Sequence, residues 1–245
     1  METREKIRIA AVGDIHVKET DKGKWTAYFQ DISKQADVLA ICGDLTDTGD
    51  ETEAEILCDE LKACTIPVVA VLGNHDYEKS RQKLIRQILQ KAGVHILDGE
   101  AVVINGVGFA GVKGFGGGFD RYMLSMFGEG AMKAFVQEAV DEALHLDRAL
   151  AKLEQEHKAM PTIAIMHYAP IQETIQGEPE AIFPFLGSSR LAEPLSRRKV
   201  TAAFHGHAHA GMLKGQTADG IAIYNVALPI LYKEGYTAGY YILEV

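Results

Sequence analysis

The stretch IRIAAVGD at residues 7–14 decides the fold class, because it is a short apolar run that ends in glycine and a carboxylate. Two later stretches repeat this design, VLAICGD at 38–44 and PVVAVLGN at 67–74. Segments of about a dozen residues with helical periodicity lie between and after them. These segments are 25–35, 51–64 and 80–93. Short strands that alternate with amphipathic helices predict βαβ units and a parallel sheet.

The second half of the chain changes character. Asn105 and Gly106 separate two apolar runs, 101–104 and 107–112, and this pair predicts a hairpin. Residues 129–158 form one long amphipathic pattern, which predicts a helix that ends before Pro161. Further strands are predicted at 162–168, 200–207, 221–227 and 239–245, and a helix at 188–199. We therefore expect one α/β domain over 1–245, with two packed sheets, helices outside them, and residues 170–190 as a candidate partial cap.

Composition and charge exclude several classes of protein. The 245 residues are 47% hydrophobic and 24% charged, which is typical of a globular chain and excludes wholesale disorder. A net charge of −9 gives no sign of a dedicated nucleic-acid surface. No apolar stretch is long enough for a membrane helix, and the charged first residues lack a secretory core. Three cysteines without CxxC spacing fit reduced thiols, so a cytoplasmic location is expected.

Polar side chains follow five of the predicted strands. The motifs are GDIH at 13–16, GDLTD at 43–47, GNHD at 73–76, MHY at 166–168 and AFHGHAHAG at 203–211. Each motif alone has a plain structural explanation, such as a cap, a turn or a packed histidine. Together they would meet at the carboxyl ends of the strands, and burying them without a cation would be costly. Carboxylate, amide and imidazole donors without thiolate suit Mn, Fe or Zn, and a structural zinc site is disfavoured.

The histidine stretch leaves two interpretations open when it is taken alone. If residues 200–207 form a strand, alternation sends His205, His207 and His209 to one face, apart from any bend at the glycines. Such a cluster is either a solvated, pH-sensitive group or part of a metal site.

In this order, the five motifs resemble the signature of the calcineurin-like metallophosphoesterases. The resemblance covers residues 13–209 and implies a four-layer α/β/β/α sandwich with a dinuclear metal site. By position, it implies that one ion is held by Asp14, His16, Asp44 and His209, and the other by Asp44, Asn74, His167 and His207. His205 has no place in the family pattern, so we expect it to pack or to contact a ligand.

The resemblance also implies hydrolysis of a phosphoester, in which a hydroxide bridging two divalent ions attacks phosphorus in line with the leaving oxygen. His75 matches the family's non-ligand histidine and is the expected proton donor, with Asp47 as the residue that orients it. Phosphoprotein phosphatases of the family have Arg and Glu where this chain has Thr48 and Asp76. The expected substrate is therefore a small phosphodiester, such as a cyclic nucleotide, or a small phosphomonoester.

Two further features of the sequence are candidate parts of the site, and one competing function is left open. The glycine-rich stretch at 113–121 lacks the GK[ST] of a nucleotide-binding loop and is either a flexible connection or a lid. Arg121 and Arg190 are candidate phosphate contacts. The competing function is a non-catalytic metal-binding interaction module, a scaffold on the same fold, although the full ligand set and His75 argue against it.

Overall fold

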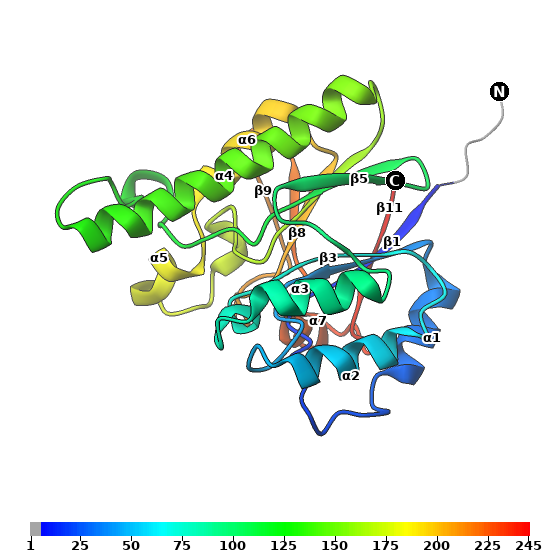
Figure 1. Cartoon of the computed structure of the whole chain (residues 1–245). Helices are drawn as coiled ribbons and strands as arrows, with labels where there is room; N and C mark the ends of the chain where they lie inside the picture. Colours follow the sequence, from blue (N-terminus) through cyan, green and yellow to red (C-terminus); the bar gives the residue numbers. More distant parts are fainter. Residues whose placement is uncertain (1–5) are drawn as a thin grey trace.

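The computed structural model describes residues 6–245, and its first sheet contains the strands expected from the opening motifs (Figure 1). The strand order is β11-β1-β2-β3-β4, in which β1 to β4 are parallel and β11 pairs antiparallel with β1. The bounds are β1 (Arg8–Val12), β2 (Val38–Cys42), β3 (Val68–Val71), β4 (His95–Ile96) and β11 (Tyr241–Glu244). This order places the carboxyl ends of β1, β2 and β3 side by side.

The second sheet has the order β5-β6-β7-β8-β10-β9. Its central strands are parallel, while β5 and β9 pair antiparallel at the two edges. The bounds are β5 (Glu100–Ile104), β6 (Val107–Gly111), β7 (Thr162–Ile165), β8 (Ala202–His205), β9 (Lys214–Gln216) and β10 (Ala222–Asn225). The predicted hairpin joins β5 to β6, and Asn105 and Gly106 both have the positive φ that this turn requires.

Helices cover the outer face of each sheet, as Figure 1 shows. The first sheet is covered by α1 (Thr26–Gln35), α2 (Glu51–Leu61) and α3 (Gln82–Lys91), and the second by α4 (Gly130–Glu156) and α6 (Ala192–Arg198). Shorter helices are α5 (Phe183–Leu186) and α7 (Leu228–Lys233), with 3-10 turns η1 (His75–Tyr77), η2 (Asp120–Tyr122), η3 (Glu173–Ile175), η4 (Glu180–Ile182) and η5 (Ser189–Leu191). Asp50 caps α2 in a capping box with Glu53, which explains why this helix begins where it does.

Two apolar interiors hold the layers together. Between the sheets, Ile41 and Val71 of the first sheet belong to one buried cluster with Phe109, Ile165 and Phe204 of the second. A separate buried cluster joins the outer face of the second sheet to α4 and α6. The fold is therefore an α/β/β/α sandwich of two mixed sheets flanked by helices, and the predicted fold class is confirmed.

The glycine-rich stretch is not the flexible connection that was one of the two expectations for it. Residues 113–119 are buried or half-buried, and they pass beneath α5 and the residues that follow it. Gly117 and Gly118 donate backbone hydrogen bonds to the carbonyls of Pro184 and Gly187. A Cβ atom at Gly116 would collide with the Pro184 carbonyl. The glycines thus allow close backbone packing rather than an exposed connection.

Within residues 6–245, none of the helices combines the length and the apolar composition needed to cross a bilayer.

Candidate metal centre

The polar strand ends of both sheets converge at one edge of the sandwich. Asp14 and His16 follow β1, Asp44 follows β2 and Asn74 follows β3. From the second sheet, His167 follows β7, and His207 and His209 follow β8. The backbone ties the two sheets together here, because Gly13, which follows β1, donates to the carbonyl of Val226, which follows β10 (2.8 Å).

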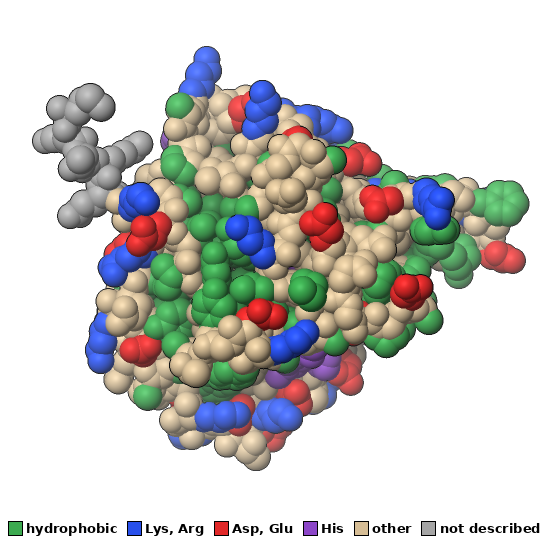
Figure 2. All heavy atoms as spheres, turned by 180° about the vertical axis from the view of Figure 1, so that it is seen from behind, with side chains coloured by type: hydrophobic (Ala, Val, Ile, Leu, Met, Phe, Trp, Pro, Cys, Tyr) green, Lys and Arg blue, Asp and Glu red, His purple; other side chains and the backbone are tan. Residues whose placement is uncertain are grey.

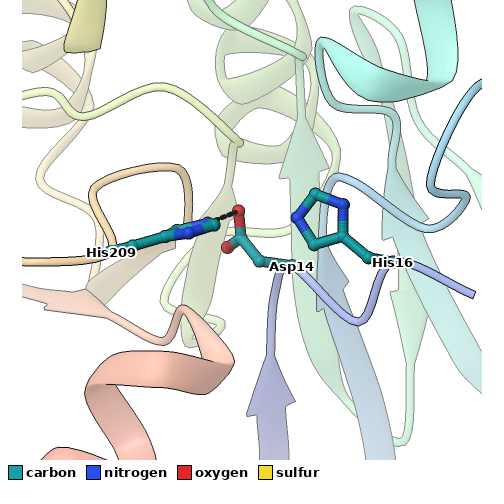
Figure 3. A group of neighbouring side chains, drawn as sticks. All are labelled: Asp14, His16 and His209. Carbon is teal, nitrogen blue, oxygen red and sulfur yellow. Dashed lines mark hydrogen bonds and ion pairs between the residues drawn. The ribbon is translucent and has the colours of Figure 1, made fainter.

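One group of potential ligands contains Asp14, His16 and His209, whose donor atoms lie within 4.8 Å of one another. His209 Nε2 lies 2.9 Å from Asp14 Oδ1, and His16 faces the same carboxylate from the opposite side (Figure 3). The backbone N–H of His207 donates to both oxygens of Asp14, at 3.1 and 3.0 Å. These hydrogen bonds fix the carboxylate between the two imidazoles.

A second group contains Asp44, His167 and His207, again with donor atoms within 4.8 Å of one another. His167 Nε2 lies 3.4 Å from Asp44 Oδ1 and 2.8 Å from Asn74 Oδ1. Asp44 also forms a group with His16 and His75. Asp44 therefore lies between the two groups, where a bridging ligand would have to lie.

The tautomer of His167 leaves a lone pair without a donor. Its Nδ1 lies 3.1 Å from the Cys42 carbonyl, which can only accept, so Nδ1 carries the proton. Burial lowers the pKa of His167 well below its usual value, so the ring is neutral and Nε2 has only a lone pair. That lone pair points at the oxygens of Asn74 and Asp44. With Asp44 ionised, three acceptors face one another, and a cation between them stabilises this arrangement.

A backbone carbonyl also orients the imidazole of His207 and fixes its tautomer. Its Nε2 lies 3.2 Å from the backbone carbonyl of Phe185, so Nε2 donates and Nδ1 keeps the free lone pair. Burial is the main cause that lowers the pKa of His207 to about 3, so the ring is neutral at neutral pH. A neutral imidazole whose other nitrogen bonds a carbonyl is the usual form of a metal-binding histidine.

His16 and Asp44 are costly groups without a cation. Both ring nitrogens of His16 are buried and have no hydrogen-bond partner among the described residues. Burial, with Asp14 and Asp76 nearby, raises the pKa of Asp44 to about 9. Buried imidazole and carboxylate groups of this kind are stabilised by divalent ions such as Mn, Fe or Zn, and the donor set contains no thiolate. The residues present therefore fit the expected metal site.

The backbone at this edge is strained at four non-glycine residues. Asp14, His16, Asp44 and His207 all have positive φ, at 60°, 44°, 48° and 70°. Non-glycine residues adopt this conformation at an energetic cost, and they cluster where function requires it. Gly43 also has positive φ (84°), and a Cβ atom there would overlap the imidazole of His167. The glycine that precedes Asp44 thus allows the two sheets to approach.

His75 and Asp47 meet, although not through their side chains. His75 Nδ1 lies 2.6 Å from the backbone carbonyl of Asp47, so Nδ1 carries the proton and Nε2 faces Asp44 Oδ2 at 3.9 Å. The Asp47 carboxylate instead lies near His16 Nδ1 (3.7 Å) and Lys18 Nζ (3.6 Å). The expected pair is close in space, and the contact that orients His75 comes from the main chain of residue 47.

Asp76, which the sequence marks only as a difference from protein phosphatases, has a clear structural role. Its buried carboxylate accepts from the backbone N–H groups of Leu45 (3.2 Å), Thr46 (2.8 Å) and Gly73 (2.8 Å), and from Thr46 Oγ1 (2.5 Å). It therefore ties the turn after β2 to the turn after β3. The only sequence signal for this role is the position of Asp76, a carboxylate in a turn two residues after the predicted ligand Asn74.

The histidine stretch does not continue as a strand. β8 ends at His205, and His207 has positive φ, so the prediction that alternation sends all three histidines to one face is wrong. His205 is fully buried, with Nε2 2.7 Å from Thr174 Oγ1 and Nδ1 2.8 Å from the Gly206 carbonyl. Of these three histidines, His207 and His209 enter the potential ligand groups found among the described residues, and His205 does not.

The structure does not bring the two predicted phosphate-binding arginines into the cluster. Arg121 donates to the Tyr122 hydroxyl at 2.7 Å and is exposed. Arg190 donates to the Leu124 carbonyl at 3.0 Å and lines a small crevice between α4 and α6.

Comparison with solved structures finds proteins of similar fold. Phosphopantetheinyl hydrolase (PptH) from Mycobacterium tuberculosis has a similar structure, with a TM-score of 0.66, 15% identity, and coverage of 97% of this chain and 96% of that chain. The protein TT1561 of Thermus thermophilus has a TM-score of 0.56, 16% identity, and coverage of 90% and 89%. GAP50 of Plasmodium has a TM-score of 0.53, 12% identity, and coverage of 92% and 73%. These likenesses show a shared fold.

A search among curated proteins found no match. The family described as calcineurin-like phosphoesterase matches residues 7–211, which span all the strand ends described above. The chain therefore belongs to the calcineurin-like phosphoesterase family.

Proposed function

We propose that the protein is a metal-dependent phosphoesterase that hydrolyses a small phosphodiester or phosphomonoester, with water attacking phosphorus in line with the leaving oxygen. The observation that carries this proposal is the position of Asp44 between two groups of imidazole and carboxylate donors. Two adjacent divalent ions, when bound, supply an activated water and neutralise the phosphoryl oxygens.

The proposed ligands divide between the two sides of Asp44. Asp14, His16, Asp44 and His209 would hold the first ion, and Asp44, Asn74, His167 and His207 the second. Hydrogen bonds to the remaining nitrogens fix the two second-site histidines, because the Cys42 carbonyl accepts from His167 and the Phe185 carbonyl accepts from His207. Such partners orient ligands and raise their basicity.

His75 is the proposed proton donor to the leaving oxygen. The Asp47 carbonyl holds its Nδ1–H, so Nε2 is the nitrogen that faces the site. The His75 side chain is 38% exposed, which leaves room for a substrate oxygen beside Nε2. General acid catalysis of this kind contributes about 10²- to 10⁴-fold to the rate. Asp47 acts as a positioning residue through its main chain.

The test compares hydrolysis of p-nitrophenyl phosphate and bis-p-nitrophenyl phosphate with and without added Mn²⁺. We expect Mn²⁺-dependent turnover of at least one, and the ratio of the two rates separates monoesterase from diesterase. His75→Ala should lower kcat about 10²- to 10⁴-fold while the bound metal is unchanged. His145→Ala, an exposed histidine of α4, is the matched control and should keep full activity.

The competing function is a metal-binding scaffold. GAP50, which is described as the anchor in the inner membrane complex of Plasmodium, shares the fold. Metal binding without Mn²⁺-dependent turnover of either ester would favour the scaffold, because the same ligands would then serve no chemistry. Full activity of His75→Ala would remove that residue from the mechanism.

A further inference from the structure

An apolar crevice of about 410 Å³ opens beside His207. Its walls include Phe115, Phe135, Tyr168, Ile182, Phe185 and His207. The volume falls within the range of ligand pockets, about 300–1,000 Å³. The crevice thus joins an aromatic surface to one of the proposed metal ligands.

The rings form a continuous path from the crevice to the cluster. Centroids lie 4.8 Å apart for Phe135 and Phe115, 5.8 Å for Phe115 and Tyr168, and 4.4 Å for Tyr168 and His207. His207 in turn lies 4.7 Å from His167. A group bound against these rings would therefore lie next to a phosphoryl group held at the second metal position.

The crevice offers few hydrogen bonds. Among its lining side chains, only the Tyr168 hydroxyl and the His207 imidazole are polar. Lys113 lies behind the wall, 4.8 Å from the Phe115 ring, where Glu142 is 3.8 Å from its ammonium group. A sugar or nucleoside placed here would lose hydrogen bonds to water without replacing them. An alkyl or aryl group would lose none.

The rim of the crevice remains exposed in the free protein. Phe185 is 58% and Ile182 is 38% exposed. Figure 2 shows further apolar side chains gathered at the projecting end of the molecule. The carbonyl of Phe185 also accepts the hydrogen bond that orients His207. The short helix α5 therefore contributes both to the apolar rim and to the position of the proposed metal ligand.

We propose that this crevice receives the organic group of the substrate, so that the enzyme prefers phosphoesters of alkyl or aryl alcohols to those of sugars and nucleosides. The inference rests on the proposed phosphoesterase function and names its substrate class. The crevice is continuous with His207, so an apolar group bound in it would extend along an apolar wall to the phosphoryl position. For this reason we assign the crevice to the organic group of the substrate.

The test uses p-nitrophenyl alkyl phosphate diesters from methyl to hexyl, in the Mn²⁺-loaded protein. The leaving group is the same throughout, so only the apolar group changes. We expect kcat/KM to rise roughly two- to fourfold for each added methylene until the crevice is filled. Phe185→Ala and Phe135→Ala should flatten this dependence. Phe127→Ala, an 83% exposed phenylalanine that does not line the crevice, is the matched control and should keep it.

A second readout does not depend on turnover. Hexylphosphonate should bind at least tenfold more tightly than methylphosphonate in calorimetry, with a more negative heat-capacity change. Metal-dependent hydrolysis that is independent of chain length, with equal binding of the two phosphonates, would overturn the inference and leave the proposed function intact. Absence of hydrolysis with every diester of the series and with p-nitrophenyl phosphate would instead overturn the proposed function. Retained chain-length dependence in both crevice variants would assign the apolar site elsewhere.

Discussion

Replacing Asp76 with asparagine tests how the two strand-end turns are held together. The carboxylate accepts four hydrogen bonds, two at each oxygen, from Leu45, Thr46 and Gly73. Burial raises the pKa of Asp76, and these donors oppose that shift by favouring the ionised form. An asparagine has one oxygen and one NH₂ group, so one pair of donors must face another donor.

The less costly orientation places the NH₂ group against Thr46. The Thr46 hydroxyl can rotate and accept from it, but the Thr46 backbone N–H is then buried without a partner, which costs about 1–3 kcal/mol. The two bonds that remain lose their charged acceptor, and each weakens by about 1 kcal/mol. Part of this loss is offset because no charge has to be buried. The expected destabilisation of Asp76→Asn is about 2–4 kcal/mol.

Urea denaturation at neutral pH measures this change as a lower midpoint with an unchanged m-value. Asp59→Asn is the matched control, because Asp59 is exposed and pairs only with Lys62 across one helical turn, and it should change stability by less than about 1 kcal/mol. Mn²⁺ affinity should also fall, about 10- to 100-fold, since Asp44 and Asn74 lie on the two turns that lose their tie. A loss below about 1 kcal/mol for Asp76→Asn would show that the buried carboxylate does not hold the two turns together.

Two further predictions concern the backbone and the charges. Gly43→Ala should destabilise the protein about 1–3 kcal/mol more than Gly93→Ala, because both glycines have positive φ but only Gly43 lies against another side chain; equal thermal shifts would contradict this. Arg8 hydrogen bonds lower the pKa of Asp37, so the stability from this pair should be present above about pH 4 and be lost as the pH falls through the lowered pKa. The urea midpoints of Asp37→Asn and of the native chain, measured between pH 3 and 7, should converge as the pH falls. A difference between them that grows in acid would contradict the prediction.

The first three strands of the first sheet could be predicted from the sequence because their information is local. Each of the first three strands ends in glycine and a polar residue, and a helix follows each of them. The hairpin at Asn105 and Gly106 is equally local, since the turn itself needs positive φ. The order of the second sheet depends on pairing between strands far apart in the chain, and β9 (Lys214–Gln216) is too short and polar to give a periodic pattern.

The candidate site could be predicted only as a set of residues. Motif order brought together the proposed ligands, but alternation places His205 with His207 only if the strand continues, and β8 ends at His205. The backbone contact from Asp47 to His75 could not be foreseen, since a sequence shows side chains and not which carbonyl is free to accept. The apolar crevice depends on α4, α5 and the glycine-rich stretch packing together, which is a tertiary event.

The proposed role of Asp44 is to join two metal positions. Its most direct test is the metal-to-protein ratio after Mn²⁺ loading and removal of free ion, measured by inductively coupled plasma mass spectrometry in the native chain and in Asp44→Asn. We expect a ratio near two in the native chain and a ratio of one or less in the variant. A native ratio near zero, or an unchanged ratio of two in Asp44→Asn, would contradict the account.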